Sequence, residues 1–187
     1  HPRRPRRCRP SRPSASSGRT SHGDRPDLAT RSQQDPVPAS PGTYVLIFEA
    51  SAGRRVRIGS LGTIDLQPGF HAYVGSARGP GGLAARLAHH RRRARRPHWH
   101  IDYLRRHTAL REVWFARGLA EREHRWAGIL GSSPATTIPM ERFGASDCRC
   151  RSHLFGFAAR PRVSAFRAWL ETTATPLDVA RCPYRSL

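Results

Sequence analysis

The chain has 187 residues, enough for one domain of ordinary size with flanking segments and a substantial core. Its 33 basic residues, all arginine, face 13 acidic ones for a formal net charge of +20, which favours a polyanionic partner such as nucleic acid. No apolar run approaches the ~20 residues of a membrane helix, and four scattered cysteines do not fit a disulfide-stapled secreted domain, so a cytoplasmic protein without a membrane partner is expected.

Residues 1–40 are rich in arginine, proline and serine and contain almost nothing that could pack. Such a segment cannot offset the entropy of ordering, so we expect a disordered leader without chemistry of its own. The composition changes at Pro41, and the folded domain is expected to cover residues 41–171. Residues 172–187 show no pattern and are interpreted as a tail.

The strand signals begin with residues 42–48, a continuous run of β-branched and aromatic residues typical of a central strand covered on both faces. Residues 55–58 and 63–66 alternate polar with apolar side chains and have glycines between them, which predicts a half-exposed hairpin. Further strands are predicted over residues 70–75 and 109–116.

A glycine-rich turn over residues 76–82 leads into a helix predicted from about Leu83 until Pro97 stops it. Arg86 and His90 are four residues apart, so a helix places both on one side. A strand, a flexible turn and a helix that bring a cation and an imidazole together indicate a phosphate-handling corner. The end of this helix carries an arginine cluster that is either a solvated face or a nucleic-acid contact, namely Arg91, Arg92, Arg93, Arg95 and Arg96.

A helix predicted over residues 119–130 has an acidic residue, Glu123, in the middle of its apolar stripe. A carboxylate on the core side of a helix is costly to desolvate unless it has a partner or a metal. A metal or active-site role is therefore favoured, and a buried ion pair with an arginine is the alternative. The stripe itself consists of Leu119, Ala120, Trp126, Ala127 and Leu130. Shorter helical segments are predicted over residues 98–104 and 163–170, the latter packed around Phe166, Trp169 and Leu170.

Cysteine and histidine residues form a second possible site, Cys148-x-Cys150-x-x-His153 together with His98 and His100. Such ligands close together suit tetrahedral zinc. The one-residue gap between the cysteines is shorter than in common zinc motifs, and two cysteines so spaced on one strand would point to opposite faces. Zinc is therefore an alternative at this position.

Several short motifs occur in a fixed order: Gly42-Thr43-Tyr44, Tyr73-Val74-Gly75, Arg86 with His90, and Glu123. Together they resemble the GIY-YIG nuclease superfamily over about residues 42–157. The longer pattern with YVGSA, PGGL, HWHIDYL and GASDCRCRSHLF is similar to the branch catalogued as domain of unknown function 123. The hairpin between the two tyrosine motifs is an insertion relative to the superfamily.

The resemblance implies an α+β fold, a small antiparallel three-stranded sheet flanked by helices, with the inserted β-hairpin. It implies a metal-dependent endonuclease that hydrolyses phosphodiester bonds of DNA, without strong sequence preference. Arg86 would contact the phosphate, Tyr44 or Tyr73 would orient or deprotonate the attacking water, His90 would relay a proton, and Glu123 would hold Mg²⁺ or Mn²⁺. A non-catalytic nucleic-acid-binding module of the same fold and a zinc-stabilised interaction protein are the alternatives.

Overall fold

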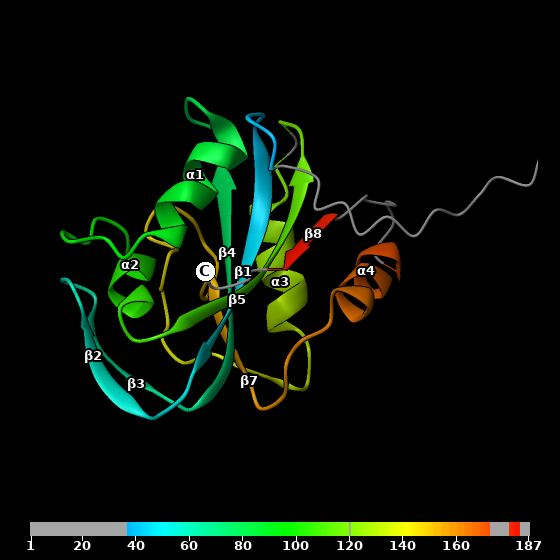
Figure 1. The fold of residues 1–187 in the computed structure, drawn as a ribbon. Coiled ribbons are helices and arrows are strands. Elements are labelled where there is room, and N and C mark those ends of the chain that lie inside the picture. The colour runs from blue at the N-terminus through cyan, green and yellow to red at the C-terminus, as the bar shows by residue number, and fades with distance from the viewer. Residues whose placement is uncertain (1–36, 120, 173–179, 184–187) are drawn as a thin grey trace, which may run out of the picture. The chain divides into compact units, whose positions relative to one another are not determined.

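The computed structural model describes residues 37–119, 121–172 and 180–183 (Figure 1). These residues belong to the second of two compact units, Gln34–Leu187, whereas the first unit, His1–Gln33, lies outside the described residues. Most of the expected leader and most of the expected tail therefore also lie outside them. The elements are β1 (Gly42–Ala50), β2 (Arg54–Ile58), β3 (Gly62–Leu66), β4 (Gly69–Ala77), α1 (Gly82–Arg91), α2 (His100–Arg105), β5 (Ala109–Arg117), α3 (Glu123–Gly131), β6 (Thr136–Thr137), β7 (Leu154–Phe157), α4 (Val163–Thr172) and β8 (Ala180–Pro183).

Strand β1 is the centre of the main sheet, as its apolar sequence predicts. Every residue of β1 except Glu49 is buried, and it pairs antiparallel with β4 on one side and β5 on the other. The sheet has the order β6-β7-β4-β1-β5-β8, and all its pairings are antiparallel. The expected three-stranded sheet is therefore too small. Strands β6, β7 and β8 extend it at both edges, and their short runs of two to four residues left little signal in the sequence.

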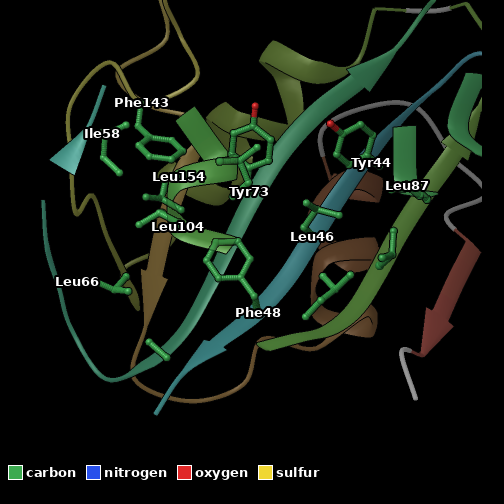
Figure 2. Packing of buried hydrophobic residues seen from close by; sticks show 14 of the residues in the cluster. Tyr44, Leu46, Phe48, Ile58, Leu66, Tyr73, Leu87, Leu104, Phe143 and Leu154 are labelled. Carbon is green, nitrogen blue, oxygen red and sulfur yellow. The ribbon is translucent and has the colours of Figure 1, made fainter. Parts of the chain in front are cut away.

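Each face of this sheet carries its own apolar core. On one face, α1, α2 and the β2–β3 hairpin pack over Leu46 and Phe48, and Figure 2 shows part of this cluster. On the other face, α3 and α4 pack over Val45 and Ile47. The predicted hairpin is present as a separate two-stranded sheet, with Val56 and Ile64 facing the first core. The combination of helices with an antiparallel sheet confirms the mixed α and β class but not the three-stranded sheet.

Two helices differ from the sequence prediction at one end, and a third differs in the side chains that it buries. Helix α1 ends at Arg91, six residues before Pro97, because the chain turns extended at Arg92 and its N–H bonds to His89. Helix α3 begins at Glu123 instead of Leu119, and the Leu119 side chain is 76% exposed outside the predicted stripe. In α4, Phe166 and Leu170 are buried as predicted, but Trp169 is on the exposed side. Ala120, also assigned to the stripe, lies outside the described residues.

The segment before β1 is held to the domain by backbone hydrogen bonds. The N–H groups of Leu83 and Ala84 at the start of α1 donate to the carbonyls of Ser40 (2.9 Å) and Pro38 (3.0 Å). Strand β8, in the stretch expected to be a patternless tail, pairs antiparallel with β5. None of the described helices is both long and apolar enough to cross a membrane.

Candidate active site

A cleft of about 490 Å³ opens where β1 and β4 meet the first turns of α2 and α3, the middle of α1 and the loop after Phe143. The five residues that the sequence places in a catalytic constellation all line this cleft. They come from four elements and are Tyr44, Tyr73, Arg86, His90 and Glu123. The remaining lining includes Ser76, Trp99 and Asp147.

The two tyrosines rise from neighbouring strands on the same face of the sheet. Tyr44 pairs with Gly75 and Tyr73 with Leu46 in the β1–β4 register, so the rings are diagonal neighbours. Figure 2 shows both hydroxyl groups at the same end of the apolar cluster. A Cβ atom added at Gly75 would lie 2.5 Å from the Tyr44 hydroxyl oxygen. The glycine after Tyr73-Val74 is therefore required because the Tyr44 ring crosses its Cα.

The Tyr44 hydroxyl and His90 Nε2 share a buried hydrogen bond of 2.8 Å. Burial, together with the neighbouring His89, lowers the pKa of His90 to about 3, so His90 is a neutral imidazole at physiological pH. A neutral ring can exchange a hydrogen bond with the phenol but adds no positive charge to the cleft. The structure thus brings His90 to the predicted place and favours a role in orienting Tyr44.

Burial also raises the pKa of both phenols. The pKa of Tyr44 lies well above its ordinary value because of burial and of Tyr73, and Arg86 only partly opposes this. For Tyr73, burial and Glu123 raise the pKa and Arg86 again lowers it. Both side chains are therefore protonated at neutral pH. Tyr73 can donate a hydrogen bond into the cleft, and Tyr44 can do so when His90 Nε2 is the donor in their shared bond.

Arg86 supplies positive charge to the cleft. Among the described residues it forms no ion pair, and its guanidinium carbon lies 4.2 Å from the centroid of the Trp99 ring. The backbone of Trp99 is fixed in turn, because its N–H donates to Asp102 at 3.1 Å. A cation stacked on an indole keeps its hydrogen-bond donors free for an anionic ligand.

Glu123 is the first residue of α3, not the middle of its stripe, and its side chain is 19% exposed. Its Oε1 atom lies 3.1 Å from Nδ1 of His153. Burial raises the pKa of Glu123, but the nearby His153 imidazole and Ser76 hydroxyl outweigh burial, so the pKa lies below its ordinary value. Glu123 is thus a carboxylate at neutral pH, held in place and turned toward the cleft.

The Glu123 carboxylate fits a hard divalent cation. Magnesium prefers oxygen ligands, keeps several waters and is usually bound by one or two carboxylates. Glu123 offers such an oxygen on the cleft wall, and Asp147 lines the same cleft. The donor chemistry therefore agrees with the Mg²⁺ or Mn²⁺ that the sequence resemblance implies.

The arginine cluster does not line this cleft. Its members are exposed at and beyond the end of α1, and they are Arg91, Arg92, Arg93, Arg95 and Arg96. Arg93 lines a separate hollow of about 410 Å³ together with Arg54, Arg106 and Arg111. The guanidinium of Arg106 donates to the carbonyls of Ala94 (3.1 Å) and Arg95 (2.6 Å), which fixes the path of the cluster. The cluster and the cleft are thus distinct features.

The cysteine and histidine residues that the sequence offers as one zinc site lie in two separate groups in the structure. His98 and His100 line the cleft, and His100 Nδ1 accepts a hydrogen bond from the N–H of Gly144. Cys148, Cys150 and His153 gather instead with His124, a residue the sequence analysis did not single out. No local spacing connects His124 to the cysteines, because α3 and the later loop meet only in the folded chain.

Comparison with known proteins gives one match. A family model described as domain of unknown function DUF123 matches residues 43–174, more than half of the chain. No curated protein and no solved structure matches the chain.

Proposed function

This chain belongs to the DUF123 family, and we propose that it is a metal-dependent phosphodiesterase of GIY-YIG type that acts on DNA. One observation carries the proposal. Two phenols, a neutral imidazole, a carboxylate and a cation that has no ion-pair partner within the described residues converge on one cleft from β1, β4, α1 and α3. This set matches the order and the types of residue in the GIY-YIG motifs.

Arg86 is assigned to the scissile phosphate. Its planar guanidinium can donate to two phosphate oxygens at once and stabilises the negative charge that grows during hydrolysis. The Trp99 ring supports the cation at 4.2 Å without accepting its N–H donors, so these stay available to the ligand.

Glu123 is assigned to the metal. The bound cation would polarise the phosphoryl group and stabilise the leaving oxygen. The contribution of the protein is to keep the carboxylate ionised and fixed, which the contacts with His153 and Ser76 do.

Tyr44 and Tyr73 are assigned to the attacking water. Because burial keeps both phenols protonated, they orient the water by hydrogen bonding instead of removing its proton as phenolates. His90 holds the Tyr44 hydroxyl at 2.8 Å and so fixes the direction of its hydrogen bond.

The charge of the chain supports a nucleic-acid substrate. A formal net charge of +20 and the exposed arginines after α1 suit contacts to phosphates, which attract without reading sequence. We therefore expect binding that is strongly salt-dependent and largely independent of base sequence.

The test is nicking of supercoiled plasmid with Mg²⁺ by wild-type protein and by Glu123→Gln and Arg86→Ala. Both variants should lose about 10²-fold or more in nicking rate while they still bind the plasmid, since each removes one charge at the reacting phosphate. Matched controls are Glu171→Gln, an exposed acid of α4, and Arg57→Ala, an exposed arginine of β2, and neither residue lines the cleft.

The controls should keep their nicking rates within about threefold at low salt. Tight plasmid binding without cleavage by the wild-type protein would refute the phosphodiesterase and support a non-catalytic binding module. Equal loss of nicking in Glu171→Gln and Glu123→Gln would refute the assignment of Glu123.

A further inference from the structure

Four metal-ligating side chains gather beside the cleft but outside its lining. The ligand atoms of His124, Cys148, Cys150 and His153 all lie within 4.8 Å of one another. Both cysteines are free thiols, and both are half-buried. The set combines two thiol and two imidazole donors, the Cys₂His₂ combination that structural zinc sites use.

The separations of these atoms match a tetrahedral ion. Cys148 Sγ lies 3.5 Å from His153 Nε2, and Cys150 Sγ lies 3.5 Å from His124 Nδ1. Zinc bonds of 2.3 Å to sulfur and 2.0–2.1 Å to nitrogen, at tetrahedral angles, give a sulfur to nitrogen distance of about 3.6 Å. The two contacts therefore have the length of the edges of a zinc tetrahedron.

The one-residue gap between Cys148 and Cys150 does not separate their side chains here, because these residues are not in a strand. Residues 144–150 form turns instead of a strand. The exposed Arg142 guanidinium donates to the carbonyls of Cys148 (2.6 Å) and Cys150 (3.3 Å) and so ties these turns together. Arg142 has a positive φ of 62°, so the chain reverses direction there. Because the turns are tied to one guanidinium, both sulfur atoms reach the same group of ligands.

A second contact points to a metal at His153. When Nε2 binds a metal, Nδ1 must carry a proton, and such rings usually donate it to a carboxylate. His153 is 1% exposed, and its Nδ1 faces Glu123 Oε1 at 3.1 Å. Nδ1 makes no hydrogen bond within the described residues, so this carboxylate lies close enough to accept its proton after a small rotation of the ring.

We propose that His124, Cys148, Cys150 and His153 bind one zinc ion that fixes the loop after Phe143 to the first turn of α3. Four protein ligands leave no open position, so the ion is structural and not catalytic. Soft thiolate ligands with imidazole select zinc over magnesium, so this site is separate from the one assigned to Glu123.

The position of the ion gives it an effect on the cleft. The same loop carries Gly144, Ser146 and Asp147 of the cleft lining, and His124 follows Glu123 directly in α3. Zinc would therefore hold two walls of the cleft together and fix the His153 ring that contacts Glu123. The site stands on its own geometry and does not depend on the proposed hydrolysis.

The experiment measures zinc in purified full-length protein and replaces it with Co²⁺. We expect one zinc per chain and, with cobalt, the visible bands of a tetrahedral ion with thiolate charge transfer. Cys148→Ser and His124→Ala should each weaken zinc binding by at least about 10-fold in competition with a chelator, and Glu123→Gln by about 10-fold or less. His98→Ala, which removes an exposed histidine of the cleft, should keep one zinc per chain.

The wild-type measurement decides the matter even if a ligand variant fails to fold. Folded wild-type protein without zinc and without a tetrahedral cobalt spectrum would overturn the proposal, as would full zinc content in both ligand variants. Loss of zinc in the His98→Ala variant would overturn the ligand set. Metal content is independent of plasmid nicking, so failure of this proposal and failure of the phosphodiesterase are separate results.

Discussion

Substitution of Gly75 by alanine tests how the cleft is built. The new Cβ would lie 2.5 Å from the Tyr44 hydroxyl oxygen and 2.6 Å from Cζ, closer than real Cβ contacts. Because Gly75 lies in the centre of the sheet, the Tyr44 ring must move and release its 2.8 Å hydrogen bond to His90. Overpacking costs about 1–3 kcal/mol and a lost buried hydrogen bond about 1 kcal/mol, so unfolding free energy should fall by about 2–4 kcal/mol.

Urea denaturation followed by circular dichroism measures this change. Gly79→Ala is the matched control, because an added Cβ there meets nothing within 4 Å, and its effect should stay within about 0.5 kcal/mol. In a Tyr44→Ala background the obstacle is gone, so Gly75→Ala should become nearly neutral. Equal effects at Gly75 and Gly79, or an undiminished cost without the Tyr44 ring, would refute the reasoning.

Three other predictions concern acid stability, the support of the cation and the arginine cluster. Burial lowers the pKa of His71 to about 4, so as pH falls the unfolded chain takes up this proton before the folded chain does. The free energy of unfolding therefore decreases as pH drops from about 6.5 toward 4. Urea titrations at pH 7 and pH 5 should show that His71→Phe removes about 2 kcal/mol of this decrease. Trp99→Leu should lower kcat/KM for plasmid nicking about fivefold by freeing Arg86, whereas the same change at the exposed Trp169 should leave it unaltered. Arg93→Ala should reduce the slope of log affinity for DNA against log salt by about one, as measured by fluorescence anisotropy, and an unchanged slope would place the DNA elsewhere.

The long elements of the fold could be predicted because their signals are local. The apolar run of β1 and the alternation in the β2–β3 hairpin each specify their own burial, and both are confirmed. The edges could not be predicted, because strands of two to four residues exist only through their partners. The start of α3 was also misplaced, since the apolar spacing continues back to Leu119 while the chain there is not helical.

For the candidate site too, local contacts could be predicted from the sequence and contacts between distant segments could not. Tyr44, Tyr73 and Arg86 come from one region of the chain, where strand pairing and helix spacing bring them together. Glu123 reaches the same cleft, but from a helix N-terminus and not from the buried stripe that the sequence indicated. The partnership of His124 with the cysteines was not accessible, because it depends on how α3 packs against the loop after Phe143.

The two halves of the cleft differ in how firmly they are attached to the sheet. Tyr44 and Tyr73 belong to the antiparallel pair β1–β4, whose ladder is continuous over nine residues and is bordered on the other side by β5. Separating these two rings requires the central strands of the sheet to unfold, which amounts to global unfolding. The amide protons of β1 and β4 should therefore exchange with solvent most slowly. Moving Glu123 away needs only the first turn of α3 to fray, together with release of His124 when the proposed zinc ion is bound. Local fluctuations of α3 therefore change the distance between the Glu123 carboxylate and the two phenols, whereas the distance between the phenols stays constant.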